Sequence, residues 1–383
     1  MSAAIPTQRR RGPASDTWPC VRLGDVATYV NGYAFKPTDW SSAGRPIIRI
    51  QDLTGNSYQM NRYSGNVPEK YEVIKGDVLI SWSASLGVYI WDREDAFLNQ
   101  HIFKVVFDKE DIDKRYFFHQ VSLILRKSAF EAHGCTMKHL TKPVFDALQF
   151  VLPPLAIQRR IAAKLDLLCD IVAKRKNQLS QLNQLVKSRF VEMFGNVKSS
   201  VAIGERFKTQ SGGTPKSSEN KFYENGTIPW LTSGEVGQGV VRKVDRCITQ
   251  AGLDNSSAKW TPIDSVLVAM YGATAGKVGL LKIKATTNQA VCSILPAQGM
   301  MPEFVYYAVA SKTDWMLQQA AGGAQPNISQ GVVRKMRIPN PPLALQREFA
   351  AFVEKVDKLA FAARRRRDVA RQLYRAKIQE FFG

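Results

Sequence analysis

The sequence contains one nonapeptide twice, as LPPLAIQRR from Leu152 to Arg160 and as NPPLALQRE from Asn340 to Glu348. The offset between the copies is 188 positions, and the match continues without a gap until an EMFG ending in one copy and an EFFG ending in the other. Residues 153–195 therefore recur as residues 341–383, so the chain is built on an internal repeat.

The similarity extends towards the N-terminus of each copy, where it is weaker. GDVLISW at residues 76–82 faces DSVLVAM at residues 264–270, and Asn99-Gln100 faces Asn288-Gln289. A period of this length is typical of a duplicated domain and not of a solenoid. The sequence therefore predicts two copies of a unit of about 190 residues. In each copy a variable region precedes a uniform segment.

The uniform segments are predicted to be long helices, because their apolar residues lie mostly three or four positions apart, as in a heptad stripe. The stripe residues are Ile161, Leu165, Leu168, Val172, Leu179, Leu182, Val186, Phe190 and Met193 in the first segment, and Phe349, Val353, Val356, Ala360, Ala363, Ala370, Tyr374, Ile378 and Phe381 in the second. Proline pairs stand where helices begin. A helix of about 40 residues is roughly 60 Å long, so we expect the two to pack on each other as a coiled coil. The alternative is that each stripe only covers its own domain.

The variable regions read as mixed α/β with short strands. Strands are expected at residues 46–50, 77–82, 87–91 and 101–107, then at 227–232, 265–271, 277–283 and 290–295. A helix is expected near 116–132 and another near 302–320. Turn-rich links such as SGGTPKSSEN separate these elements.

The charge balance favours a polyanionic partner. The net charge is +20 and the pI is about 9.8, which suits a nucleic acid or an anionic surface. No apolar run is long enough to span a membrane, and the first residues have no secretory signal core but carry Arg9, Arg10 and Arg11, a predicted basic arm. Five scattered cysteines without a CxxC pair indicate reduced thiols, mostly in the core, and a cytoplasmic location.

Three motifs are compared with catalytic signatures and do not match them. NPPL at Asn340–Leu343 lacks the aromatic residue of the Asn-Pro-Pro-aromatic motif of DNA amino-methyltransferases, and the other copy has no asparagine. GATAGKV at Gly272–Val278 is one residue short of a phosphate-binding loop and lacks its Ser or Thr, so we interpret it as a glycine-containing loop between strands. Four histidines show no metal-ligand spacing. The sequence therefore favours a binding protein over an enzyme.

Basic, aromatic and amide residues are mixed in the predicted loops, which suits phosphate anchoring together with reading of base edges. The candidate DNA-contacting residues are Lys36, Arg45, Ser81, Trp82, Ser83, Lys138 and His139 in the first variable region, and Lys216, Ser217, Lys221, Tyr271, Thr274, Lys277, Gln325 and Asn327 in the second. No catalytic residue and no metal ligand is predicted.

Taken together, the chain resembles the specificity subunit of a type I DNA restriction–modification system. The resemblance rests on the two variable regions, each followed by a PPLA-[IL]-Q-R helix that ends in E-[MF]-F-G. It implies an α+β fold with two pseudo-repeated target recognition domains, separated by two long conserved helices that pack as an antiparallel coiled coil. The expected domains are residues 1–152 (domain 1, with 1–17 as a flexible arm), 153–195 (helix), 196–340 (domain 2) and 341–383 (helix).

The resemblance also implies how such a chain acts. Each domain would read one half of a bipartite site in double-stranded DNA, and the helices would hold two methyltransferase subunits, with restriction subunits joining outside. S-adenosylmethionine, ATP and Mg would bind to those partners, and this chain would bind no cofactor and catalyse nothing. Two alternatives remain open: a stand-alone methyltransferase or nuclease–methyltransferase fusion, and a coiled-coil scaffold that binds no nucleic acid.

Overall fold

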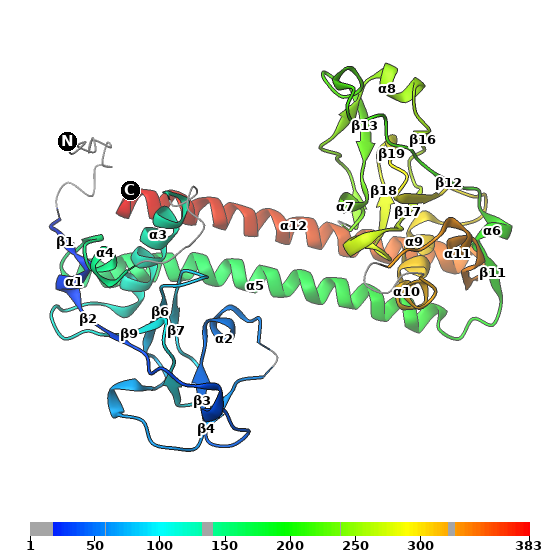
Figure 1. Cartoon of the computed structure of the whole chain (residues 1–383). Helices are drawn as coiled ribbons and strands as arrows, with labels where there is room; N and C mark the ends of the chain where they lie inside the picture. The colour runs from blue at the N-terminus through cyan, green and yellow to red at the C-terminus, as the bar shows by residue number, and fades with distance from the viewer. Residues whose placement is uncertain (1–17, 58, 132–140, 238, 321–325) are drawn as a thin grey trace. The chain divides into compact units, whose positions relative to one another are not determined.

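The computed structural model divides into two compact units, and many of their elements are labelled in Figure 1. Unit 1 comprises Met1–Lys176 and Arg365–Gly383, and unit 2 comprises Asn177–Arg364. The structure describes residues 18–57, 59–131, 141–237, 239–320 and 326–383. The limits of the units fall inside the two long helices and not at the helix ends. They therefore do not test the domain boundaries predicted from the repeat, which stay predictions.

Unit 1 contains two four-stranded sheets. One has the order β2-β9-β6-β7 and is antiparallel, with β2 at Thr28–Asn31, β9 at Ile102–Val106, β6 at Val78–Ser81 and β7 at Gly87–Ile90. The other has the order β4-β3-β8-β5, with β4 at Arg62–Tyr63, β3 at Arg45–Ile48, β8 at Ala96–Leu98 and β5 at Glu72–Val73, and its β3 and β8 are parallel. A third pair joins β1 (Cys20–Arg22) to β10 (Gln149–Val151).

Unit 2 repeats this topology. The order β12-β20-β17-β18-β14 corresponds to the first sheet plus one strand, with β12 at Thr209–Ser211, β20 at Val291–Ile294, β17 at Val266–Ala269, β18 at Val278–Leu281 and β14 at Val240–Val241. The order β15-β13-β19-β16 corresponds to the second, with β15 at Cys247–Ile248, β13 at Ile228–Leu231, β19 at Ala285–Thr287 and β16 at Trp260–Thr261. The strands β11 (Ser200–Ala202) and β21 (Arg337–Pro339) form the third pair. The repeated strand order confirms the duplication.

Short helices connect the strands in both units. Unit 1 has α1 (Leu23–Val26), α2 (Ile50–Thr54), α3 (Lys114–Glu131), α4 (Lys142–Asp146) and the 3-10 turns η2 (Pro37–Asp39) and η3 (Glu69–Tyr71). Unit 2 has α6 (Ile203–Arg206), α7 (Ser233–Val236), α8 (Gln250–Asp254), α9 (Pro302–Ala310), α10 (Thr313–Gln318), α11 (Gln330–Lys335) and the 3-10 turns η4 (Asn220–Phe222) and η5 (Gly272–Thr274).

The expected strands match observed strands to within about two residues, but the single helix expected near residues 302–320 is wrong. It is broken into α9 and α10 at Ser311 and Lys312. The Thr313 hydroxyl donates to the carbonyls of Ala310 and Gly276. A side chain that binds nearby carbonyls in this way competes with the backbone ladder of a continuous helix.

The two long helices are α5 (Leu155–Phe194) and α12 (Leu343–Phe382), each 40 residues long. In unit 1, Ile161 and Leu165 of α5 share a core with Ile378 and Phe381 of α12. The start of α5 therefore lies with the end of α12.

In unit 2 the relation is reversed, because Phe190 near the end of α5 packs on Phe349 near the start of α12, with ring centroids 5.5 Å apart. The helices are therefore antiparallel, as expected. The alternative reading also holds in part, since each stripe covers a domain core as well as the other helix.

The glutamine of the repeated nonapeptide explains why the motif occurs twice. Gln158 is buried, its side-chain carbonyl accepts the backbone N–H of Asp113 at 2.9 Å, and its amide donates to the carbonyls of Asp111 and Pro153 at 3.1 and 2.9 Å. Asp113 directly precedes α3. One side chain thus satisfies backbone groups that the start of α3 would otherwise leave unpaired, and it fixes α3 to α5.

Gln346 makes the same contacts in unit 2. Its carbonyl accepts the N–H of Met301, the residue before α9, at 2.9 Å, and its amide donates to Pro341 and Gly299 at 3.0 and 3.5 Å. The repeated motif is therefore a joint between each domain and a long helix, which requires a buried amide and a proline pair ahead of the first helical turn.

The prediction that the cysteines are mostly core residues is wrong for the described ones. Only Cys292 among them is buried, whereas Cys20 is exposed and Cys169 and Cys247 are half-buried. All four are free thiols, as expected for a reduced protein.

Candidate nucleic-acid interface

The candidate residues of domain 1 occupy two loops and a strand edge. Lys36 is exposed just before η2. Arg45 begins β3, where it pairs with Glu72 at 2.8 Å and lies over the ring of Phe97. The guanidinium of Arg45 is therefore already engaged, although half of the side chain is exposed.

Ser81, Trp82 and Ser83 lie where β6 turns towards β7. The ring of Trp82 stacks on Phe103 at 5.6 Å, and its indole N–H donates to Asn31. Both serines are buried, and the hydroxyl of Ser81 donates to the carbonyl of Ser85. Neither hydroxyl is thus presented to solvent in this structure.

The candidate residues of domain 2 are more exposed. Lys216 and Lys221 flank Glu219, with both nitrogens 3.6 Å from its carboxylate. Such exposed ion pairs contribute about 0–1 kcal/mol, so they would yield readily to a phosphate. Ser217, in the same loop, is also exposed.

A second group gathers at the end of the β17–β18 hairpin. Tyr271 is exposed and forms an isolated backbone bridge with Asn327, so the structure brings together two residues far apart in sequence. The hydroxyl of Thr274 donates to the Tyr271 carbonyl, and Lys277 is exposed. As expected, the glycine-containing segment that begins at Gly272 forms a loop between strands; it ends at Lys277, and Val278 begins β18. Lys138, His139 and Gln325 lie outside the described residues.

The β6–β7 and β17–β18 loops share one backbone feature but differ in length and in side chains. Residues 82–86 join β6 to β7, whereas residues 270–277, which include η5, join β17 to β18. Ala84 and Gly272 are equivalent in the repeat and have φ of 56° and 67°, a left-handed conformation that favours glycine and strains alanine. At the preceding position one loop carries buried Ser83 and the other exposed Tyr271. Equivalent loops that differ in length and in side chains are suited to reading different sequences.

Two stacked cation–aromatic pairs were missed by the sequence reasoning. Lys284 lies 4.6 Å from the centre of the exposed Trp260 ring, and Arg49 lies 5.4 Å from that of Trp40. Exposed rings with a bound cation can stack on bases and neutralise phosphates. No local sequence signal identifies these pairs, because Lys284 and Trp260 come from separate segments.

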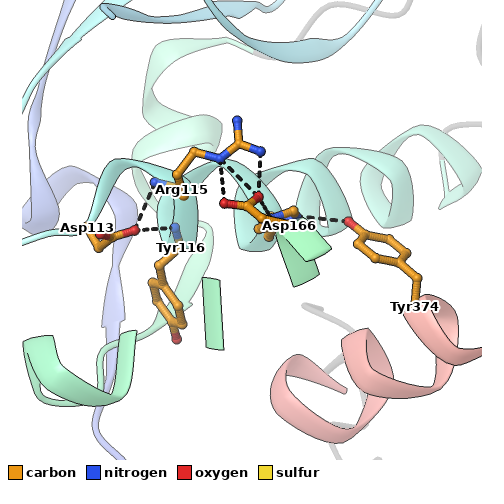
Figure 2. A network of polar contacts seen from close by, with 6 residues as sticks. Asp113, Arg115, Tyr116, Asp166 and Tyr374 are labelled. Carbon is orange, nitrogen blue, oxygen red and sulfur yellow. Dashed lines mark hydrogen bonds and ion pairs between the residues drawn. The ribbon is translucent and has the colours of Figure 1, made fainter. Parts of the chain in front are cut away.

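A partly buried polar network ties domain 1 to both long helices (Figure 2). The Arg115 Nε donates to the Asp166 carboxylate at 2.9 Å, the Nε2 of His119 lies 2.7 Å from Asp166 Oδ1, and its Nδ1 lies 3.1 Å from the Tyr374 hydroxyl. Arg115 and His119 belong to α3, Asp166 to α5 and Tyr374 to α12.

Burial lowers the pKa of His119, and the hydrogen bond to Asp166 opposes this only in part. Burial tends to raise the pKa of Asp166, but hydrogen bonds from Arg115 and His119 hold it below its usual value. The pair is therefore a neutral imidazole beside a carboxylate. His119 has no exposed surface, and the network joins α3 to α5 and α12.

A groove of about 810 Å³ lies in unit 2, lined by β18, α9 and α12 among others. Asp357 of α12 lines it, and burial raises its pKa, against the opposing charges of Arg242 and Arg364. Within the described residues, no group of three or more His, Cys, Asp or Glu could hold a metal ion. Among the helices of the described part of the chain, none is long and apolar enough to cross a membrane.

Similarity to known proteins covers both repeats. The family model described as "Type I restriction modification DNA specificity domain" matches residues 15–184 and 197–369. The EcoBI specificity subunit of Escherichia coli is 26% identical over 388 residues, which are 89% of this chain and 79% of that protein. The MjaVIII specificity subunit of Methanocaldococcus jannaschii is 22% identical over 411 residues, which are 94% of this chain and 90% of that protein.

Solved structures show the same fold at low sequence identity. The S subunit of a type I restriction–modification system from M. genitalium has a TM-score of 0.60 and 14% identity, with 96% of each chain covered. A chain from work on complex assembly and conformational transition of the type I R-M system has a TM-score of 0.55 and 18% identity, with 98% of this chain and 99% of that chain covered. By the match of the family model to both repeats, the chain belongs to the type I restriction–modification DNA specificity family.

Proposed function

We propose that this chain is the DNA-recognition subunit of a type I restriction–modification complex and that each domain reads one half of a bipartite site. The main observation is a pair of equivalent hairpin loops, one in each domain. Each has a residue in the left-handed conformation at the same repeat position, Ala84 or Gly272, but the side chains beside it differ. Two independent readers need a repeated frame and separate reading surfaces. The charge of +20 supports a phosphate backbone as the common partner.

The test is an exchange of one domain. Replacing residues 200–338 with the matching region of another family member should change one half of the methylated site and leave the other half intact. The ends of this region pair as β11 and β21, with Ser200 opposite Pro339, so the exchange keeps a closed boundary. A change in both half-sites would contradict independent reading.

The proposal assigns chemistry to partners. Two methyltransferase subunits would supply S-adenosylmethionine, and restriction subunits would supply ATP and Mg, while this chain would bind no cofactor and work in the cytoplasm. The support is that two motifs compared with catalytic signatures have structural roles. Asn340–Leu343 leads into α12, and Gly272–Val278 connects the strands of a hairpin. Purified chain mixed with labelled S-adenosylmethionine and duplex DNA should transfer no label. Stoichiometric transfer after removal of contaminating methyltransferase would contradict it.

The long helices are proposed to set the gap between the half-sites. Phe194 at the end of α5 is packed on Phe304 of α9 in unit 2, so residues added after Gly195 would not lengthen α5. The informative change is four residues added to both helices, after Lys176 and after Arg364. Four helical residues add roughly 6 Å, which is one or two base-pair steps of about 3.4 Å. Methylation mapping should show a wider gap between unchanged half-sites, and an unchanged gap with retained activity would contradict the proposal.

A further inference from the structure

The ends of α5 and α12 make nearly interchangeable apolar contacts. Phe194 of α5 meets Phe304 of α9 edge-on, with ring centroids 4.8 Å apart, and its repeat equivalent Phe382 of α12 meets Tyr116 of α3 edge-on at 5.4 Å. Phe304 and Tyr116 are themselves equivalent in the repeat. Apolar contacts alone would therefore also allow a second arrangement, in which two copies of the chain associate. In this dimer, which we call a dimer of like halves, domain 1 of each copy binds the end of α5 of the other copy instead of the end of its own α12.

The polar network of unit 1 makes the two helix ends different. Tyr374 of α12 bonds to His119, but the equivalent position of α5 carries Val186, which has no hydrogen-bonding group. In unit 2, the position equivalent to His119 is Tyr307, whose ring packs on Phe349 at 5.5 Å. The two units therefore accept different helix ends.

The chemistry of His119 explains the discrimination. Asp166 accepts the proton on Nε2, so the neutral ring leaves Nδ1 as an acceptor for the Tyr374 hydroxyl. With Val186 in place of Tyr374, this buried acceptor would have no partner, which is a costly state. In unit 2 the wrong helix end would place the bulk of Tyr374 where Val186 now fits, and overpacking is also unfavourable.

We propose that His119 and Tyr374 form an address that assigns the end of α12 to domain 1 and excludes the end of α5 of a second copy. The address is thus a determinant of correct assembly, because a dimer of like halves would separate the two different domains of each chain. This proposal does not depend on which DNA sequence the chain reads.

The experiment uses the full chain in two variants. The erased variant lacks the His119–Tyr374 pair in unit 1, and the duplicated variant carries a second such pair in unit 2. His119→Tyr with Tyr374→Val gives domain 1 and α12 the Tyr–Val pair of the other unit, and Tyr307→His with Val186→Tyr gives unit 2 the His–Tyr pair of the first. After refolding at one concentration, light scattering should show at least about a tenfold larger dimer fraction for both variants than for the parent. The duplicated variant keeps the domain 1 network intact, so it tests the proposal even if the erased variant folds poorly.

A cysteine reporter identifies the kind of dimer. Cys169 of α5 contacts Tyr374 in unit 1, so in a dimer of like halves position 186 of one copy should lie beside Cys169 of the other. Val186→Cys added to the erased variant should give a Cys169–186 disulfide between copies under mild oxidation, with loss of two thiol protons and two electrons to the oxidant. The parent carrying Val186→Cys alone should not form it.

The control removes a contact between the helices that lies outside the address. Glu348→Gln breaks the exposed ion pair with Arg189, whose nitrogen is 3.1 Å from the carboxylate, and should leave the dimer fraction unchanged. Monomers in both the erased and duplicated variants would overturn the proposal. It would also be overturned if Glu348→Gln dimerised to the same extent, because loosening of the helix pair would then be the cause.

Discussion

The junctions of the two units use the same backbone contacts and different side-chain chemistry. Gln158 and Gln346 fix the start of α3 and of α9 in the same way. Around them, unit 1 places a His–Asp–Arg–Tyr network, whereas unit 2 places a group of aromatic rings that includes Phe190 and Phe349, which meet edge-on. Unpaired backbone groups at a helix start therefore require the same glutamine in both copies, whereas the side chains that pack beside this glutamine differ between the copies.

The largest expected difference concerns equivalent apolar positions. Phe349→Ala should destabilise unit 2 by about 3–5 kcal/mol, because the ring is fully buried against Phe190, Phe194 and Tyr307. Ile161→Ala, the same position in unit 1, should cost about 2–5 kcal/mol and towards the lower end, since a smaller side chain is removed. Hydrogen exchange of α9 and of α3 in increasing denaturant measures the two losses separately.

Leu359→Ala on the exposed face of α12 is the control for that pair, because its side chain is 56% exposed and the change should stay within about 0.5 kcal/mol. A loss below about 1 kcal/mol for Phe349→Ala would show that the rings of unit 2 do not support the junction.

Much of the fold could be predicted from the sequence because the repeat and the stripes are periodic signals. Periodicity identified the duplication, the strands and the long helices, since these depend on local spacing. The break at Ser311 could not be predicted, because it involves the Gly276 carbonyl from a distant hairpin. The glutamine of the nonapeptide could be identified from the sequence only as a repeated residue. Its role in fixing α3 and α9 depends on contacts with residues about 45 positions away.

The candidate site was less predictable because loop side chains are set by distant partners. Ser81 is a candidate by its place in the sequence, but its hydroxyl is turned towards Ser85 and buried. Trp260 was omitted, although Lys284 stacks on its exposed ring. A loop sequence shows which groups are present but not which of them face solvent, and that is decided by packing.

The second prediction tests whether the glutamine joints are equivalent. Gln158→Leu and Gln346→Leu each leave buried backbone groups of the domain unpaired, which should cost about 1–3 kcal/mol in each unit. Because the two side chains make the same contacts, the losses measured by hydrogen exchange at α3 and α9 should agree with each other. Gln181→Leu, on the exposed surface of α5, is the matched control and should change little. A large loss in one unit alone would break the equivalence of the joints.

The third prediction concerns the pH dependence of the stability of unit 1. The pKa of His119 is below 6.5 in the folded protein because of burial, so the unfolded state binds more protons as pH falls. The stability that His119 contributes is therefore complete above about pH 6.5 and is lost as pH falls towards the folded pKa. Hydrogen exchange of α3 between pH 7 and 5 should show falling protection, and His119→Tyr should remove the dependence. Unchanged protection of α3 in the parent would contradict a buried neutral imidazole.

The smallest expected effect has the opposite sign and lies in unit 2. Burial raises the pKa of Asp357 above 3.8, and Glu303 adds to this, while Arg242 and Arg364 oppose it. The folded state thus binds a proton more readily than the unfolded state, so this group favours folding more as pH falls through its folded pKa and less above it. Asp357→Asn should stabilise unit 2 at pH 7, by at most about 1 kcal/mol because the half-exposed carboxylate is screened by water. Hydrogen exchange of α9 at pH 7 and pH 4 measures this, and the gain should shrink at the lower pH. A destabilised variant at pH 7 would show that attraction to the two arginines outweighs the cost of burial.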